Sequence, residues 1–386
     1  RFCGIHFFNP PRYMPLVELI ATPATRPEAL DALETFVTST LGKSVVRARD
    51  TPNFVANRIG IAGILATIRE AGNFGLAYDV VDELTGKKLG RASSATFRTA
   101  DVVGLDTMAH VIETMRDTLP DDPFHPLYAM PPALAALIEK GALGQKSGAG
   151  FFKKVGKDIL RLDPATGEYV PGGGKAEPIV DRILKKPAAE RLKLLRESSH
   201  PQAAFLWAIL RDGFHYAAVH LESIADNARD VDFAMRWGFG MKQGPFELWQ
   251  EAGWPQVAQW VKEDIDAGKA LSKAPLPAWV FEGPVPQQGV HTPEGSWSPA
   301  RKAYVPRSKL PVYERQHFPE NVLGAGAVQP LASGTEVWKN DHVRLWTLDG
   351  EVLIASITSK MHLIGPTVGE GLVKALDLAE AGWQGL

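Results

Sequence analysis

The stretch FCGIHFFNP, residues 2–10, leads through a proline-rich loop into the stretch LVELIA, residues 16–21. Both pieces are short, apolar and bounded by proline, which predicts two buried strands over residues 2–8 and 16–21. If these strands pair, the loop brings His6 beside Glu18. A carboxylate that holds an imidazole fixes its tautomer and stabilises the imidazolium, so the pair predicts a proton-transfer site. The alternative is a core histidine with an unrelated surface glutamate.

A second stretch, DTPNFVANR at residues 50–58, opens a long helix. A capping side chain followed by Pro52 is typical of a helix start. The apolar run that follows predicts a largely buried helix over residues 54–72. Asn57 and Arg58 lie in its first turn, where a side-chain amide can hydrogen-bond a small ligand that carries an oxygen.

The two motifs together resemble the L-3-hydroxyacyl-CoA dehydrogenase family, in the order G-x-H-F-F-N-P, L-V-E and D-x-P-x-F-x-x-N-R. The resemblance implies that His6 is the general base or acid, that Glu18 is its partner, and that Asn57 contacts the substrate oxygen. It also implies that Asn9 of the first motif binds substrate. The family usually has glycine where this chain has Asn53, and asparagine tolerates a left-handed backbone, so we expect the turn to be kept.

NAD is the cofactor that the resemblance implies, yet the usual glycine-rich turn of a dinucleotide-binding domain is absent from the sequence. The stretches at residues 41–44 and 238–240 each lack a glycine that such a loop needs. We therefore expect residues 1–48 to be the C-terminal tail of a Rossmann domain whose larger part is missing. Because the sequence begins at Arg1, inside the motif, we interpret it as a fragment that binds no NAD on its own.

The composition is that of a metabolic enzyme. A length of 386 residues allows two or three domains, and 45% hydrophobic residues can fill their cores. A formal net charge of −2 gives no reason to expect a nucleic-acid or membrane partner. The single Cys3 excludes an internal disulfide framework and favours a location in the cytoplasm. No transmembrane run, signal peptide or metal site is expected.

A degenerate duplication is predicted in the helical part of the chain. The apolar helix at residues 205–221 corresponds to that at 54–72, and the Asp-rich stretch at 230–235 corresponds to that at 79–82, a period of roughly 150 residues. The second copy has no counterpart of the D-x-P-x-F-x-x-N-R motif, which predicts a supporting role. In the first copy, Lys87, Lys88 and Arg91 are predicted either to face a phosphate of CoA or simply to be solvated.

A strand, a two-residue turn, a second strand and a helix are predicted over residues 343–381. They resemble the opening of the enoyl-CoA hydratase (crotonase) fold. The predicted fold class is therefore mainly α: a duplicated helical dehydrogenase C-terminal domain, preceded by the tail of a Rossmann α/β domain and followed by the start of a crotonase-like domain. The segments are 1–48 (Rossmann tail), 49–152 (first helical domain), 153–198 (connector), 199–269 (second helical copy), 270–333 (linker) and 334–386 (crotonase start).

The function that the resemblance implies is the NAD-dependent oxidation of (S)-3-hydroxyacyl-CoA to 3-oxoacyl-CoA in fatty-acid β-oxidation, in a multifunctional enzyme fused to an enoyl-CoA hydratase. Its partners are an acyl-CoA substrate and a second copy of the chain, which would pair through the helical domain. One alternative is another β-hydroxyacid or sugar-nucleotide dehydrogenase, which usually has a lysine on the long helix where residues 54–72 have none. The other alternative is a non-catalytic helical interaction module.

Overall fold

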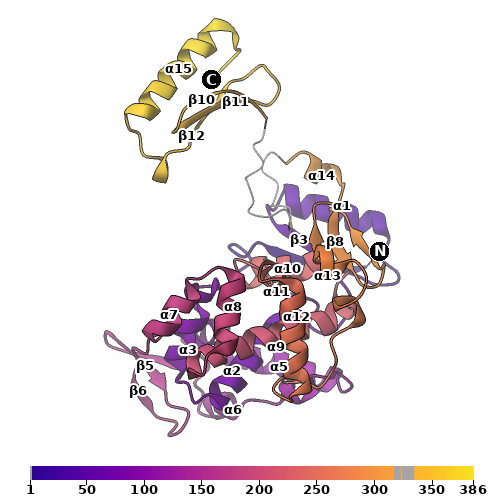
Figure 1. Cartoon of the computed structure of the whole chain (residues 1–386), viewed down its shortest axis with the longest axis vertical. Coiled ribbons are helices and arrows are strands. Elements are labelled where there is room, and N and C mark those ends of the chain that lie inside the picture. Colours follow the sequence, from indigo (N-terminus) through magenta and orange to yellow (C-terminus); the bar gives the residue numbers. More distant parts are fainter. Residues whose placement is uncertain (1, 317–322, 324–333) are drawn as a thin grey trace. The chain divides into compact units, whose positions relative to one another are not determined.

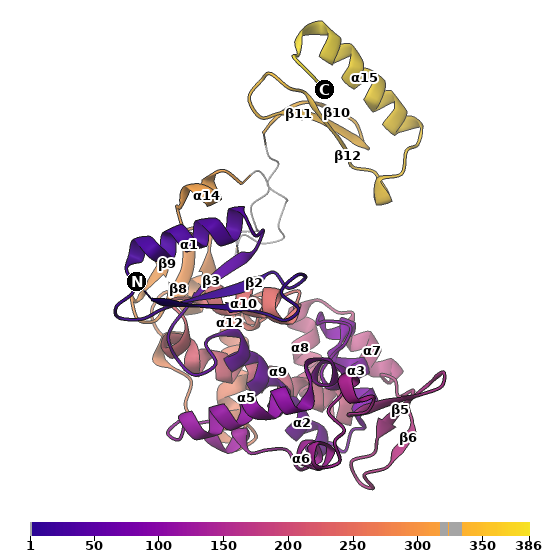
Figure 2. The same cartoon turned by 180° about the vertical axis from the view of Figure 1, so that it is seen from behind.

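The computed structural model describes residues 2–316, 323 and 334–386. Contacts within the chain divide it into two units, of which the first comprises Arg1–Ser308 and Leu323 and the second lies within Lys309–Leu386. Figure 1 shows the chain from one side and Figure 2 from the opposite side. Both sequence motifs discussed above lie in the first unit.

A three-stranded sheet with one covering helix begins the first unit. The strand order is β1 (Cys3–Phe7), β2 (Leu16–Ala21) and β3 (Ser44–Ala48), with β1 antiparallel and β3 parallel to β2. Helix α1 (Pro27–Ser39) connects β2 to β3, and its buried Leu30 and Val37 pack against the odd-numbered residues of β2. Because successive strand residues point to opposite faces, Glu18 points away from α1.

Helices build most of the remaining first unit. The two longest of this unit, α2 (Ala56–Asn73) and α9 (Pro201–Ile224), pack against each other (Figure 2). Most of the residues of both helices are buried. None of the helices that the structure describes is both long and apolar enough to span a membrane. The helices of this unit that follow β3 are α2 (Ala56–Asn73), α3 (Tyr78–Thr85), α4 (Phe97–Val103), α5 (Leu105–Thr118), α6 (Pro132–Glu139), α7 (Pro178–Leu184), α8 (Ala188–Glu197), α9 (Pro201–Ile224), α10 (Ala228–Phe239), α11 (Pro245–Glu251), α12 (Trp254–Asp266) and α13 (Val285–Gln288).

Two buried aspartates each accept hydrogen bonds from the start of the helix that follows their own. Asp82 in α3 accepts hydrogen bonds from three successive backbone N–H groups at the start of α4, over 2.7–3.0 Å. Asp232 in α10 accepts hydrogen bonds from two backbone N–H groups at the start of α11, both at 2.9 Å. The first N–H groups of a helix have no partner inside the helix, so each carboxylate satisfies donors that would otherwise be buried and unpaired.

The expectation of a mainly α fold is wrong, because strands run through both the predicted connector and the predicted linker. One antiparallel sheet consists of β4 (Phe152–Val155), β5 (Asp158–Leu162) and β6 (Tyr169–Pro171), and another of β7 (His291–Thr292), β8 (Gly295–Ser298) and β9 (Ala303–Val305). Strands of two to five residues are too short to show an apolar alternation in the sequence. Of the predicted linker, residues 317–322 and 324–333 lie outside the described residues.

The second unit contains a further antiparallel sheet, in the order β10 (Thr335–Lys339), β11 (Val343–Thr347) and β12 (Ile354–Ile357). A short helix, α14 (Pro311–Glu314), precedes this sheet in the chain. Helix α15 (Pro366–Gly382) packs against β11 and β12, and its buried Val368 and Ala375 share a small core with Val343 and Leu345. This core is separate from the large core of the first unit.

A buried histidine in α9 predicts acid sensitivity of the first unit. His215 donates from Nε2 to the backbone carbonyl of Ala274 at 2.7 Å, while its buried Nδ1 has no hydrogen-bond partner among the residues that the structure describes. Burial lowers the pKa of His215 to about 4. Between its unfolded pKa of about 6.5 and pH 4, the unfolded chain therefore binds a proton that the folded chain does not bind.

We expect this difference to lower the free energy of unfolding by about 2 kcal/mol between pH 6.5 and pH 5. His215→Gln cannot titrate and should lose less stability over the same pH interval, as measured by urea unfolding. The exposed His110 supplies the control, because His110→Gln should retain the pH dependence of the wild type. Equal pH dependence in His215→Gln and the wild type would show that His215 is not responsible.

Candidate active site

The pairing of β1 with β2 brings His6 directly opposite Glu18. The Nδ1 atom of His6 lies 2.8 Å from the Oε2 atom of Glu18. The predicted strand pairing and the predicted hydrogen bond are thus both confirmed. Glu18 is fully buried, whereas 30% of the His6 side chain is exposed. A carboxylate can only accept, so Nδ1 donates to Glu18 and leaves Nε2 of His6 available to a ligand.

The second carboxylate oxygen of Glu18 holds the start of α2. Its Oε1 accepts hydrogen bonds from the backbone N–H groups of Val55 and Ala56, at 3.1 and 2.9 Å. The positive end of the helix dipole favours a carboxylate at this position. Glu18 therefore joins two parts of the chain that are far apart in sequence, the imidazole on β1 and the first turn of α2. The sequence predicted that a helix starts here. It did not indicate that Glu18 accepts the hydrogen bonds of the first N–H groups of that helix.

The turn before α2 has a left-handed backbone, which Asn53 can adopt in place of the usual glycine. Its φ is 62°, in the left-handed region that asparagine tolerates, as expected from the sequence. Phe54 is also left-handed, with a φ of 51°, so the helix begins at Ala56 and not at the predicted residue 54. The turn points the Phe54 ring at His6, with 5.5 Å between the ring centroids.

Aromatic rings flank the imidazole on two sides. The Phe8 ring lies 4.7 Å from the His6 ring, and Phe239 at the end of α10 lies 6.5 Å from Phe8. Phe239 thus brings the predicted second helical copy close to the site, which the sequence did not indicate. These apolar rings limit the access of water to one part of the imidazole while leaving another part exposed.

The two asparagines expected to bind substrate lie close to this pair in the chain. Asn57 is half-buried in the first turn of α2, directly after the Ala56 N–H that binds Glu18. Asn9 is exposed in the loop that follows β1, three residues after His6. Their contacts with a substrate stay predictions.

Arg58, the last residue of the second motif, has a structural role that the sequence did not reveal. Its Nε donates to the hydroxyl of Tyr216 in α9 at 2.7 Å, and its guanidinium also pairs with Asp122. Burial alone would raise the pKa of Asp122, but hydrogen bonding to His220 and the charge of Arg58 lower it to about 2. This buried network ties the first turn of α2 to α9, so Arg58 helps to position the turn that carries Asn57.

Comparisons with known proteins identify two family domains in the chain. Residues 1–51 match the family model "3-hydroxyacyl-CoA dehydrogenase, NAD binding domain", and residues 54–154 match "3-hydroxyacyl-CoA dehydrogenase, C-terminal domain". A protein of Bacillus subtilis named "Probable 3-hydroxyacyl-CoA dehydrogenase" is 41% identical over 280 residues, which are 69% of this chain and 35% of the relative. A protein of the same name from Deinococcus radiodurans is 48% identical over 161 residues, 42% of this chain and 46% of the relative.

Among solved structures, 3-hydroxybutyryl-CoA dehydrogenase of Escherichia coli shares the fold with a TM-score of 0.52 at 19% identity, over 72% of this chain and 69% of that one. The two matched family models define a dehydrogenase in which an NAD-binding domain precedes a helical domain. Residues 1–51 and 54–154 therefore belong to the 3-hydroxyacyl-CoA dehydrogenase family. It spans less than half the length of the two curated relatives described above.

These matches correct the fold class expected from the sequence. That class was mainly α, with only a Rossmann tail at one end and a crotonase-like start at the other. The family model over residues 1–51 instead makes the β1–β2–β3 sheet and α1 part of an α/β NAD-binding domain. The shared fold with the Escherichia coli enzyme extends well beyond the matched helical domain. The strands of the predicted connector and linker are too short to carry an apolar alternation, so the helices dominated the predicted class.

The matched NAD binding domain assigns NAD as the cofactor. The described residues fit the reacting end of this cofactor, because the His6 imidazole is partly exposed and is flanked by the apolar rings of Phe8 and Phe54. A glycine-rich turn of the G-x-G-x-x-G kind does not occur in the 386 residues, so no residue of this chain is assigned to the pyrophosphate.

Proposed function

We propose that the protein carrying this chain oxidises (S)-3-hydroxyacyl-CoA to 3-oxoacyl-CoA with NAD, as a step of fatty-acid oxidation. The observation that carries the proposal is the His6–Glu18 pair, whose carboxylate is buried and whose imidazole is partly exposed. The pair lies in the matched NAD-binding domain and is bonded to the start of α2 in the matched C-terminal domain, which supports the same function. The names of the relatives supply the substrate class.

The chemistry of the chain's own residues is proton transfer. His6 Nε2 accepts the proton of the substrate hydroxyl as the carbonyl forms, and Glu18 stabilises the resulting imidazolium. The N–H groups of Val55 and Ala56 keep Glu18 in place. Asn57 and Asn9 hydrogen-bond the substrate. NAD, when bound, takes the hydride from the carbon that carries the hydroxyl.

The stereochemistry of the substrate tests this proposal. We expect NADH to form when the active protein is mixed with (S)-3-hydroxybutyryl-CoA and NAD, and not with the (R) enantiomer or with free 3-hydroxybutyrate. The absorbance of NADH measures the rate. Equal rates with the free acid would place the activity among the other β-hydroxyacid dehydrogenases.

Glu18→Gln tests the positioning role of Glu18. The amide oxygen can still accept from the start of α2, and its NH2 group then faces His6 Nδ1. This exchange forces the proton onto Nε2, the atom that should accept the substrate proton. We expect kcat to fall more than about 10-fold, but less than after loss of His6, with an altered pH profile of kcat. An unchanged pH profile would show that Glu18 does not act through the imidazole.

Three finer expectations stay predictions: fusion to an enoyl-CoA hydratase, a location in the cytoplasm, and a homodimer through the helical domain. The expected absence of nucleic-acid and membrane partners also stays a prediction.

A further inference from the structure

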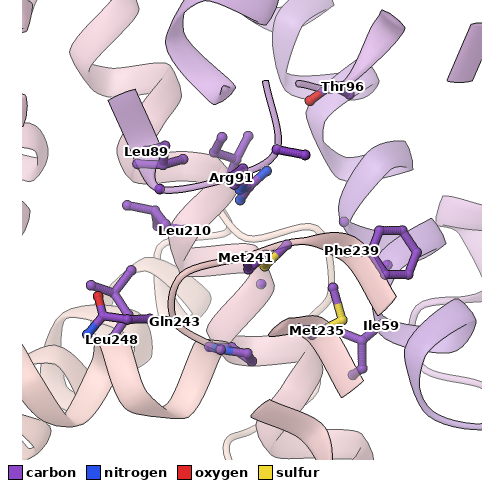
Figure 3. Close-up of a pocket in the computed structure, with 18 of the residues that line it drawn as sticks. Ile59, Leu89, Arg91, Thr96, Leu210, Met235, Phe239, Met241, Gln243 and Leu248 are labelled. Atoms are coloured by element: carbon purple, nitrogen blue, oxygen red, sulfur yellow. The ribbon is translucent and has the colours of Figure 1, made fainter. Parts of the chain in front are cut away.

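A cavity lies between α2, α9, the end of α10 and the loop between α3 and α4 (Figure 3). The space inside it is about 110 Å³, and it widens to about 960 Å³ when the open mouth is counted. Its walls are mostly aliphatic or aromatic, with Ile59, Leu210, Phe214, Met235 and Met241 among the lining residues. A concave site with an apolar lining and few polar groups is typical of a site for a small molecule.

Arg91 is the one charged residue that lines this cavity. None of the described residues hydrogen-bonds its guanidinium or forms an ion pair with it, and it is only partly exposed. Lys88 of the same loop differs, since it pairs with Asp181 and Glu83. Burial lowers the pKa of Arg91 to about 10, so it remains charged at neutral pH. Figure 3 shows Arg91 among the apolar side chains of the cavity.

The other polar side chains of the cavity already have partners within the protein. The hydroxyl of Thr96 lies 2.9 Å from that of Thr85, and the hydroxyl of Thr99 donates to the carbonyl of Ala95 at 2.6 Å. Gln243 donates to Glu251. A ligand bound in this cavity would therefore contact apolar side chains and one cationic group, the guanidinium of Arg91. A monoanion matches one guanidinium in charge, whereas a phosphate monoester would bring excess negative charge into an apolar space.

Phe239 forms a wall that the cavity shares with the candidate active site. Its ring lies against Gly60 of α2, where an added Cβ atom would be only 2.0 Å from the ring. Phe239 lies 6.5 Å from Phe8, and Phe8 lies 4.7 Å from His6. A chain that enters the cavity past Phe239 would thus begin close to the imidazole.

We propose that this cavity binds an alkyl chain that ends in a carboxylate, with the carboxylate paired to Arg91 and the chain lying along α2 and α9. The ligand has two sources: a free fatty acid, or the far end of an ω-carboxyacyl thioester whose other end lies at His6. The second source rests on the proposed dehydrogenase function, whereas the first does not.

The first experiment measures binding of dodecanoate and dodecanol to the full chain by calorimetry. We expect the wild type to bind dodecanoate at least about 10-fold more tightly than dodecanol, because the charged pair forms in an apolar environment. Arg91→Gln should lose this preference, while Lys87→Gln, at an exposed position of the same loop, should retain it. Equal binding of the two ligands by the wild type, or an unchanged preference in Arg91→Gln, would overturn the proposal.

Gly63→Leu tests the location independently of charge. A Cβ atom added at Gly63 meets nothing within 4 Å, so the first atom of a larger side chain has room at this wall of the cavity. We expect this variant to fold as stably as the wild type and to lose dodecanoate binding. Full binding by Gly63→Leu would place the ligand elsewhere and overturn the proposal.

The second experiment distinguishes the two sources in the active enzyme. It compares kcat/KM for 3-hydroxyacyl-CoA substrates of equal length that end in a methyl or in a carboxylate. A preference for the carboxylate that Arg91→Gln abolishes assigns the cavity to the substrate. Binding of dodecanoate without such a preference assigns it to a free fatty acid. If no thioester is oxidised, the proposed function fails while the binding result stands.

Discussion

Replacing His6 with glutamine is expected to lower kcat of the proposed dehydrogenase reaction by ~10²–10⁴, the range for losing a general base. Glutamine fills a similar space and can still hydrogen-bond Glu18, but it cannot accept the proton of the substrate hydroxyl. Initial rates of NADH formation with saturating (S)-3-hydroxybutyryl-CoA measure this effect. Since the loss lies in proton transfer, KM should change much less than kcat.

The matched control for this substitution is His110→Gln, because His110 is an exposed histidine of the same unit and lies outside the proposed site. It should retain the kcat of the wild type. Turnover of His6→Gln within a factor of about two of the wild type would remove His6 from the role of base.

The second large effect is expected on stability, at Asp232. Its Oδ2 atom lies 2.7 Å from Nε2 of His291, and both side chains are almost wholly buried. The other ring nitrogen of His291 lies 2.8 Å from the Ser296 hydroxyl, so this cluster joins the short sheet β7–β9 to α10. Asp232 also accepts from the start of α11. Asp232→Ala removes all of these bonds and should lower the free energy of unfolding by about 3–5 kcal/mol.

Urea unfolding of the full chain measures that loss. Asp266→Ala is the control, because Asp266 forms an exposed pair with Lys262 in α12 and its loss should cost less than about 1 kcal/mol. If the two substitutions were equally mild, the Asp232 cluster would not hold β7–β9 to the helices.

Strands and helices with a strong apolar pattern could be predicted from the sequence to within a few residues. The strand expected over residues 16–21 has those bounds, and the helix expected over 54–72 is Ala56–Asn73. The pairing of His6 with Glu18 followed from the first strand pair and is present. These features could be predicted because they depend on local patterns and on one short connection.

Features that depend on distant contacts could not be predicted. The start of α2 is held by Glu18, a residue 37 positions earlier than Val55. The strands at His291–Thr292 and Gly295–Ser298 form beside a helix that precedes them by about fifty residues, through the bond between His291 and Asp232. From the sequence, Arg91 was predicted either to face a phosphate of CoA or to be solvated, and only the packing of α2 against α9 places it in a cavity. No local pattern carries such information.

The tautomer of His6 tests the central claim most directly, because it can be measured on this chain without cofactor or substrate. Nitrogen NMR of the chain with isotope-labelled histidine distinguishes a proton on Nδ1 from one on Nε2. In the neutral ring we expect the proton on Nδ1, donated to Glu18, with Nε2 free to accept the proton of the substrate hydroxyl. A neutral ring with its proton on Nε2 would contradict the proposed role of the His6–Glu18 pair.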